Sequence, residues 1–252
     1  MKILLSPSKS LLEAGEYPNF EYSSPQFLTK SKKVNQTLKK LKPTDLVALQ
    51  DISDKLAELN YHRNKSFKPP FSSENARPAI FSFSGDVYDG LQAHTLSTEV
   101  LSRLNERIMI LSGLYGILKP FDFMQPYRLE MGTSLGVGEA KNLYEFWKKD
   151  VTAFVKKQLS KDELLVNLAS KEYASAVDLK AFKGQLVEVD FKDFHNGQLK
   201  MISFFAKKAR GMMARFLVES EAESLDDIKL FNSEGYAFDE ALSSGNKLVF
   251  TR

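Results

Sequence analysis

Short apolar runs alternate with amphipathic segments along most of this chain, and this alternation restricts the fold more than any other feature. The runs at 2–6 (KILLS), 107–113 (RIMILSG) and 163–170 (ELLVNLAS) have the length and aliphatic composition of buried strands. The segment at 142–159 places its apolar residues at helical spacing. Strands and helices therefore succeed one another along the chain.

Four more strand-like runs lie at 78–83 (PAIFSF), 185–191, 199–206 and 246–252. Asn196-Gly197 joins the second and third of these runs and is the strongest hairpin signal in the chain. Because helices connect some strands and hairpins connect others, the sequence predicts a mixed α/β fold, with a mixed sheet and surrounding helices.

No internal repeat, low-complexity linker or break in composition divides the chain. We therefore expect one domain over residues 1–252, with a helical insertion at about 25–68. The net charge is only +3, but its distribution is uneven. The insertion holds ten Lys/Arg against four Asp/Glu, whereas residues 220–240 hold seven acids and one base. This separation predicts a basic face and an acidic face.

Several classes of site are excluded by composition. The chain has no cysteine, which rules out disulfides, thiolate nucleophiles and cysteine-based metal sites. Three isolated histidines and the lack of any Glu-x-x-His pair argue against bound iron, so we expect no metal and no cofactor. No apolar run is long enough for a signal peptide or a membrane span. The expectation is a cytoplasmic protein without a membrane partner.

The segment at 206–219 predicts an amphipathic helix with one basic face. At about 100° per residue, Lys207, Lys208 and Arg215 lie opposite the apolar residues, with Arg210 at the flank. Lysines near a helix N-terminus oppose the helix dipole, as expected where positive charge binds an anion. An ordinary helix with a solvated basic face fits the pattern equally well.

Residues 44–50 and 53–65 predict two short helices, each opened by a capping residue, Thr44 and Ser53. Such a pair can direct backbone N–H groups and lysines at a phosphodiester backbone without reading bases. An antiparallel helix pair is also a common packing unit, and the glycine usual in a DNA-binding hairpin is absent. The cations that would attract phosphates here are Lys30, Lys32, Lys33, Lys39, Lys40, Lys42, Lys55, Arg63, Lys65 and Lys68.

Polar side chains follow several predicted strands. Lys9 follows the first strand, Asp86 and Tyr88 follow the run at 78–83, and Asn167 and Lys171 lie at the end of another strand. The carboxyl ends of strands in an open α/β sheet form the usual ligand site. The sequence therefore predicts a polar pocket that could take a nucleotide-like ligand.

The stretch at 113–132 (GLYGILKPFDFMQPYRLEMG) is too aromatic for a solvated loop and too rich in glycine and proline for a helix. We expect a tight crossover whose end brings Arg128 and Glu130 into the crevice beside Lys9. The i, i+2 spacing would place both side chains on one face of a strand. A buried pair that only anchors loops is the alternative. The aromatics expected in the core, and not against nucleobases, are Tyr115, Phe121 and Phe123.

Nine motifs together are more specific than any single pattern. In chain order they are SPSK at 6–9, ISDKLA at 52–57, NARPAI at 75–80, GDVYDGL at 85–91, LSGLYGILKPFDFMQPYRLEMG at 111–132, LYEFW at 143–147, VNLAS at 166–170, ISFFAKKARGMMARF at 202–216 and FNSEGY at 231–236. Over nearly its whole length the chain resembles the bacterial peroxide stress resistance proteins of the YaaA family. The family start is usually S-P-A-K-T. This chain keeps Lys9 but has Ser8 and Ser10 beside it, and the stretch after Ser134 departs from the family pattern.

The resemblance implies a cytoplasmic protein that limits free intracellular iron and protects DNA during peroxide stress. It also implies a cantaloupe-like α/β fold with a helix-hairpin-helix element, and a positively charged cleft that binds double-stranded and branched DNA. On this view the DNA-binding residues are Lys9, Lys55, Arg63, Arg128, Lys171, Lys207, Lys208, Arg210 and Arg215.

Two functions follow from these observations. The leading one is a non-enzymatic protein that binds double-stranded or branched DNA largely without sequence specificity. The alternative is an enzyme acting on a nucleotide or nucleic-acid substrate, with Asp86 or Glu130 as acid or base. Its pocket would be lined by Asp86, Tyr88, Glu130 and Asn167, with Lys9, Arg128 and Lys171 holding phosphate.

Overall fold

The computed structural model describes all 252 residues and is built around an eight-stranded mixed sheet. Across the sheet the strands are β11 (Ala237–Phe238), β12 (Lys247–Thr251), β9 (Leu186–His195), β8 (Leu165–Asn167), β1 (Lys2–Leu5), β5 (Ile108–Ser112) and β6 (Gly116–Leu118), with β10 (Gln198–Lys200) paired to β9 alone. The five strands from β12 to β5 are parallel, and the other three are antiparallel. The mixed α/β prediction is confirmed.

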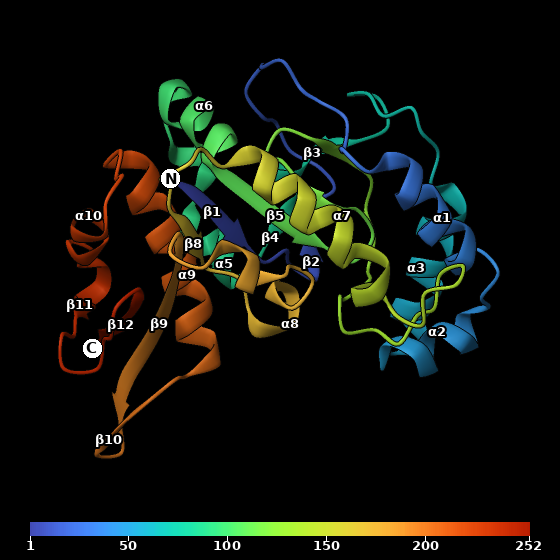
Figure 1. Ribbon diagram of the computed structural model, residues 1–252. Helices are drawn as coiled ribbons and strands as arrows, with labels where there is room; N and C mark the ends of the chain where they lie inside the picture. The colour runs from blue at the N-terminus through green and yellow to red at the C-terminus, as the bar shows by residue number, and fades with distance from the viewer.

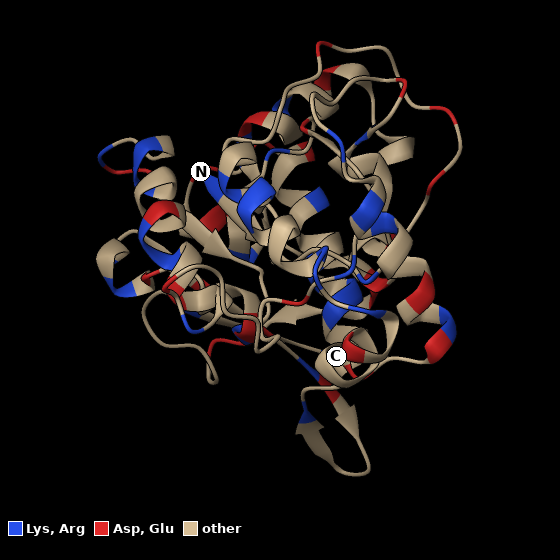
Figure 2. Ribbon diagram, turned by 90° about the vertical axis from the view of Figure 1, so that its right-hand side faces the viewer, with Lys and Arg blue, Asp and Glu red and all other residues tan.

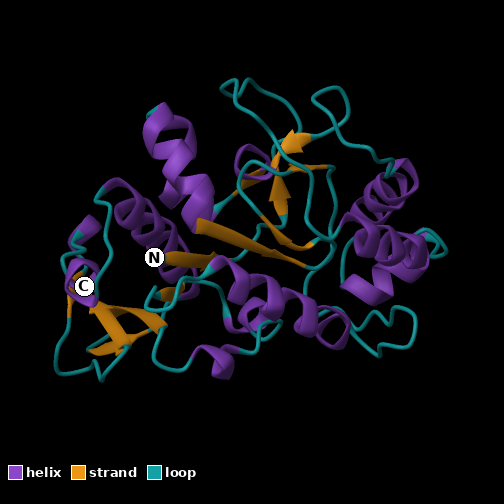
Figure 3. Cartoon of the chain, turned by 45° about the horizontal axis from the view of Figure 1, so that its top comes forward, coloured by secondary structure: helices purple, strands orange, loops and turns teal.

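Ten helices surround the sheet. They are α1 (Leu28–Leu38), α2 (Pro43–Gln50), α3 (Asp54–Ser66), α4 (Ala79–Ser82), α5 (Asp86–Leu91), α6 (Thr98–Arg107), α7 (Leu143–Gln158), α8 (Lys171–Ala174), α9 (Ser203–Glu219) and α10 (Leu225–Lys229). Helices α5, α6 and α9 pack together, whereas α7 and α8 lie in front of the sheet in the view of Figure 1. Figure 3 shows the central strands passing between these helices.

The two charge-biased segments lie far apart. Helices α1, α2 and α3 form a group at one end of the molecule, and the acidic segment with α10 and β11 lies at the other (Figure 1). One hydrophobic cluster runs from Val34, Leu38 and Leu46 of the helical group to the strands of the sheet. The helical group is thus packed against the sheet through shared apolar contacts.

Two short pairs of strands lie outside the main sheet, and they correct one prediction. The run at 78–83 is not a strand: β3 (Arg77–Pro78) pairs with β7 (Phe123–Met124), α4 follows, and β4 (Phe83–Ser84) pairs with β2 (Ser10–Leu11). Every residue from Pro78 to Phe83 is buried. An apolar run buried on all sides carries no periodicity that separates a helix from a strand.

A second correction concerns the end of the hairpin. The Asn196-Gly197 turn is present, and both residues have positive φ, 50° and 76°, as a two-residue hairpin turn requires. The strand after it stops at Lys200, however, and α9 begins at Ser203, so the second half of the run at 199–206 is helical. Phe204 and Phe205 lie on the first turn of that helix and are exposed.

Helices α5 and α9 approach each other through glycines. A Cβ atom added to Gly211 would lie 1.8 Å from the carbonyl oxygen of Val87, and one added to Gly90 would lie 2.2 Å from that of Lys208. The two backbones are therefore in direct contact, and no side chain fits between them.

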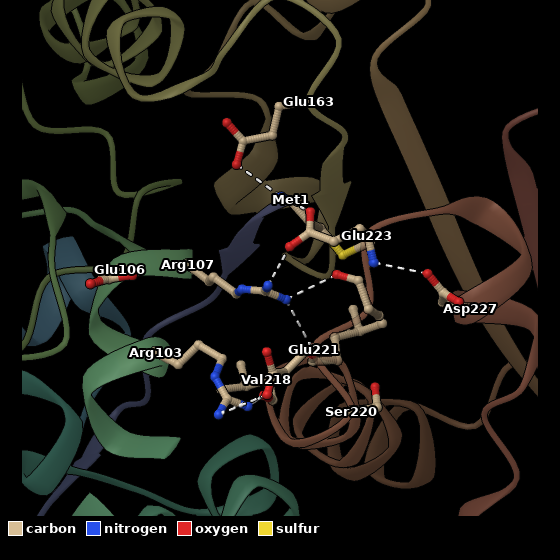
Figure 4. Close-up of polar contacts among 12 residues, drawn as sticks. Met1, Arg103, Glu106, Arg107, Glu163, Val218, Ser220, Glu221, Glu223 and Asp227 are labelled. Carbon is tan, nitrogen blue, oxygen red and sulfur yellow. Dashed lines mark hydrogen bonds and ion pairs between the residues drawn. The ribbon is translucent and has the colours of Figure 1, made fainter. Parts of the chain in front are cut away.

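The amino end of β1 is fixed by a group of ion pairs (Figure 4). The buried ammonium group of Met1 donates to Glu163 at 2.8 Å and to Glu223 at 2.9 Å. Arg107 of α6 donates to the carbonyl of Ala222 and pairs with Glu223, while Arg103 donates to the carbonyl of Val218 near the end of α9. These contacts hold β1, β8, α6 and α9 together at the edge opposite to the carboxyl ends of the strands.

The stretch at 113–132 folds as a crossover around β6 and β7. Tyr115 and Phe121 are buried, as expected, and Phe123 is partly buried. The indole N–H of Trp147 donates to the carbonyl of Gly113 at 2.9 Å, and its ring covers Gly116, which has a φ of 72°. In this crossover, side-chain contacts such as the Trp147 hydrogen bond satisfy backbone groups that have no partner in the sheet.

Asp122, in the same stretch, is 3% exposed. It accepts hydrogen bonds from the Ser23 hydroxyl at 2.6 Å and from the Lys119 N–H at 2.8 Å. Burial raises the pKa of Asp122 to about 6, although both hydrogen bonds and the Lys119 charge act in the opposite direction.

Because its folded pKa is raised, Asp122 stabilises the fold fully only below its unfolded pKa, and this contribution is lost as pH rises to about 6. The Asp122→Asn variant has no carboxyl group to ionise at this position, so it does not lose this stability. From about pH 4 to about pH 7 its free energy of unfolding is therefore expected to rise by about 3 kcal/mol relative to that of the parent. Urea unfolding of both proteins across this range measures the difference. A difference that does not change with pH would contradict the prediction.

Candidate nucleic-acid interface

A cavity of about 400 Å³ opens where β1 and β8 end. Strand β1 stops at Leu5 because Pro7, two residues further on, has no N–H for the ladder. The Ser6 hydroxyl then accepts from the Ser170 N–H at 2.8 Å, which ties the ends of the two strands together. The charged residues lining this cavity are Lys9, Asp86, Glu172, Lys207 and Arg210.

A second cavity, of about 710 Å³, adjoins the first and shares Ser170 and Arg210 with it. Its charged lining residues are Lys148, Lys171, Asp178, Lys180, Glu188, Asp190, Arg210 and Lys247. We call the two connected cavities the basic groove. It extends along the carboxyl ends of the central strands, from Lys9 to the exposed side chain of Met201.

Most cations of the basic groove have no acidic partner. Lys9 pairs with Glu130 at 2.9 Å and Lys247 with Asp190 at 3.4 Å. The remaining cations form no ion pair, and these are Lys148, Lys171, Lys180, Lys207 and Arg210. Cationic groups left without partners in a concave surface are suited to a polyanion.

Arg210 lies where the two cavities meet. Burial lowers the pKa of its guanidinium, and the charge of Asp190 acts in the opposite direction. Its Nε atom is buried and has no hydrogen-bond partner. A guanidinium without protein partners at this position has N–H groups available for phosphate oxygens.

Arg128, Glu130 and Lys9 come together at one end of the groove. Arg128 and Lys9 both contact the same oxygen of Glu130, at 3.2 and 2.9 Å, and the second oxygen of Glu130 is buried without a partner. The pair lies beside Lys9, as predicted, but Arg128 and Glu130 line neither cavity, so the prediction that they enter the crevice is wrong. Residues 128–130 form no strand. The amide of Gln50, the last residue of α2, donates to the carbonyl of Arg128 at 2.7 Å. The turn between α2 and α3 therefore lies beside this ion-pair cluster.

Three of the four remaining residues of the predicted pocket are divided between the two cavities, and Tyr88 lines neither. Asp86 lines the first cavity, and Asn167 and Lys171 line the second. The hydroxyl of Tyr88 is buried and donates to the carbonyl of Ser6 at 3.0 Å, so it positions the end of β1 and does not face the cavity.

Comparison with known proteins decides the family. The family model for "Peroxide stress protein YaaA" matches residues 1–242. The chain is 57% identical to a UPF0246 protein of Flavobacterium johnsoniae and 52% identical to one of Flavobacterium psychrophilum, in both cases over the full length of both chains. A UPF0246 protein of Idiomarina loihiensis is 45% identical over all of this chain and 98% of its own. The chain belongs to the YaaA peroxide stress protein family.

Five of the cations assigned to DNA from the sequence line neither cavity of the basic groove of this YaaA-family chain, and these are Lys55, Arg63, Arg128, Lys208 and Arg215. Lys208 pairs with Glu234 at 2.5 Å, and Arg215 pairs with Glu219 at 2.8 Å. Arg63 pairs with Glu13, and Lys55 is exposed on α3. Figure 2 accordingly shows Lys and Arg on many elements, with acids interspersed. Only part of the predicted set gathers in one place.

Sequence reasoning missed several lining residues of this YaaA-family groove. Lys148 projects from α7, Lys180 follows α8, and Lys247 begins β12. Nothing in the local pattern marks them, because an exposed lysine on a helix or at a strand start is common on any protein surface. Ser6 and Ser170 follow strands, and this position could have predicted them as lining residues of the groove.

No group of three or more His, Asp or Glu side chains is arranged to hold a metal ion. None of the helices combines the length and the apolar composition that a bilayer crossing requires.

Proposed function

We propose that this protein binds DNA in the peroxide stress response, through the phosphate backbone and largely without reading sequence. Its substrates are double-stranded and branched DNA. Bound to DNA, it helps to limit free intracellular iron and the oxidative damage that iron causes. Membership of the peroxide stress family gives the biological setting of the proposal.

The observation that carries the proposal is the set of unpaired cations in the basic groove. Five Lys and Arg side chains without acidic partners line two connected cavities. Phosphate contacts from lysine and arginine supply most of the affinity of sequence-independent DNA binding. The adjacent turn between α2 and α3, linked through Gln50 to Arg128, extends the surface available to the backbone.

Base reading is not part of the proposal. Specific contacts in the major groove need Arg, Asn or Gln side chains presented along an element that fits there. The unpaired cations of the basic groove come instead from α7, α8, α9 and the segment after α8, and all face concave surfaces. Affinity should therefore be similar for duplexes rich in A·T and rich in G·C.

A salt titration tests the proposal. With five phosphate contacts, the logarithm of affinity should fall with the logarithm of salt concentration with a slope of about −4.5, a loss of roughly 500-fold between about 50 and about 200 mM salt. Fluorescence anisotropy of a labelled duplex measures this. An affinity that hardly responds to salt would rule out the proposed mode of binding.

A second experiment, on the DNA recovered after binding, addresses the enzyme alternative. The carboxylate of Glu130 favours that alternative. Lys9 and Arg128 both contact one of its oxygens, and the other oxygen is buried without a hydrogen-bond partner. Gel and mass analysis of the DNA recovered after binding would show cleaved or altered strands if the site is catalytic. DNA recovered unchanged would rule out an enzyme that acts on DNA.

A further inference from the structure

A second concave surface lies outside the basic groove, beside the loop at 12–17. Two cavities, of about 490 and about 320 Å³, open there and share Leu12, Gly15 and Arg77 as lining residues. Neither of them has a lining residue in common with the basic groove. We call the loop at 12–17 the strap and the two connected cavities the strap cleft. In Figure 1 the strap is part of the blue loop between β2 and α1.

The buried lining residues of the strap cleft include large apolar side chains. Phe81, Phe83 and Met124 line it and are 8%, 2% and 1% exposed. Leu12, which both cavities share, is 53% exposed. An apolar side chain of a partner that covers Leu12 and reaches these residues leaves water, and this burial stabilises a complex.

Two arginines hold the strap in place. Arg63 of α3 pairs with Glu13. The Arg77 guanidinium donates to the carbonyl of Gly15 at 2.6 Å and lies over the ring of Tyr17, 5.0 Å from its centre. The strap is therefore fixed on both sides of the cleft, and a cleft that is formed in advance binds a partner at a lower entropic cost.

The strap cleft is negatively charged. Glu16, Glu74 and Asp89 line it, are exposed and form no ion pair. Arg77 is its one lining lysine or arginine, and the guanidinium of Arg77 is engaged with backbone carbonyls. The strap cleft therefore repels phosphate and attracts cations, in contrast to the basic groove.

The unpaired acids are divided between the two cavities. Glu74 lines the larger cavity, whereas Glu16 and Asp89 line the smaller one, and the apolar side chain of Leu12 is common to both. A partner that fills both cavities needs two cations with an apolar group between them. A protein segment with basic, apolar and basic side chains in that order has this pattern, and a single small cation does not.

We propose that the strap cleft docks a short segment of another protein, in which lysine or arginine residues flank large apolar side chains. The apolar side chains of this segment cover Leu12 and contact Phe81 and Met124. Its two cations pair with Glu74 and Asp89. The inference goes beyond the proposed function and does not depend on DNA binding, because the cleft and the basic groove have no residue in common.

The test measures binding of the synthetic peptide KLFLK, labelled with a fluorophore, by fluorescence anisotropy. The peptide ELFLE reverses the charges, and the peptide KSGSK removes the apolar side chains. The full-length protein is expected to bind KLFLK about tenfold or more tightly than either of the other two peptides.

Variants of the cleft locate the binding site. Glu16→Gln with Glu74→Gln removes one unpaired acid from each cavity and should weaken KLFLK binding about tenfold. The matched control is Glu139→Gln with Glu240→Gln. Both of these glutamates are exposed, form no ion pair and lie outside the cleft, so the control changes net charge equally. It should reduce affinity by about twofold at most.

The apolar contribution is measured with Leu12→Asn. Leu12 is exposed, so this variant is expected to keep the Tm of the parent. It should lose about fivefold in affinity for KLFLK and bind KSGSK as the parent does.

Each other outcome overturns the inference. Equal losses in the two glutamine variants would make net charge, and not the cleft, responsible for binding. Equal affinity for KLFLK and ELFLE would exclude a role for the acids, and no binding of KLFLK at about 1 mM would exclude this partner chemistry altogether. If light scattering shows a dimer that Glu16→Gln with Glu74→Gln abolishes, the occupant of the cleft is a second copy of this chain.

Discussion

Gly211→Ala is expected to destabilise the protein by about 3 kcal/mol. The added methyl group would lie 1.8 Å from the carbonyl oxygen of Val87. That oxygen belongs to the backbone of α5, which cannot move aside as the end of a flexible side chain could. The gain of about 1 kcal/mol in helix propensity on replacing glycine by alanine is smaller than the cost of separating the two helices.

Thermal unfolding measures the effect, and a fall in Tm of about 10 °C corresponds to this loss for a chain of this length. Gly138→Ala is the matched control. A Cβ at Gly138 would meet nothing within 4 Å, and its φ of 62° adds only about 1 kcal/mol of backbone strain. Equal losses in the two variants would show that the α5–α9 contact is more adaptable than its geometry indicates.

The contact between α5 and α9 also matters for the basic groove. Asp86 comes from the start of α5, and Lys207 and Arg210 come from α9, so the packing of the two helices sets their relative positions. The glycines are therefore structural residues on which the geometry of the first cavity depends.

Reversing two charges in the groove is expected to abolish most DNA binding. Lys171 and Lys207 are exposed, line different cavities and have no acidic partner. Lys171→Glu with Lys207→Glu replaces two attractions to phosphate by two repulsions. We expect a loss of about a hundredfold in affinity for duplex DNA at low salt, and a salt slope reduced in size by about two.

The control reverses the same number of charges at the opposite edge of the sheet. Lys161 and Lys183 are exposed and precede β8 and β9, whereas the groove lies where the strands end. Lys161→Glu with Lys183→Glu therefore changes net charge equally and should reduce affinity only a few-fold. Similar losses in both variants would mean that net charge, and not the groove, governs binding.

Much of the fold was predictable because local chemistry and tertiary structure agree. The apolar residues of β1, β5 and β8 are buried, and the Asn196-Gly197 turn forms as its φ preferences require. Ser53 caps α3 as predicted, accepting from the Leu56 N–H. The prediction that Thr44 opens α2 is wrong, because the helix begins at Pro43 and Lys42 is its N-cap. Where burial was complete on every side, as at 78–83, the pattern was lost and the prediction of a strand was wrong.

The candidate site was predictable only in part. Lys9, Asp86, Asn167 and Lys171 follow strands, and the topology of a parallel sheet brings such positions to one edge. Which cations remain free was not predictable. Lys208 lies next to Lys207 on α9 but is paired with Glu234, which comes from a segment 26 residues away.

The sequence by itself determined the element types of most segments, the family, and the placement of polar side chains at strand ends, because each depends on neighbours within a few residues. Only the tertiary structure decided which lysines and arginines are neutralised by distant acids. It also decided that α5 and α9 meet backbone to backbone, and that the apolar start of α9 is left exposed beside the groove. These features depend on contacts between segments far apart in the chain, which no local pattern records.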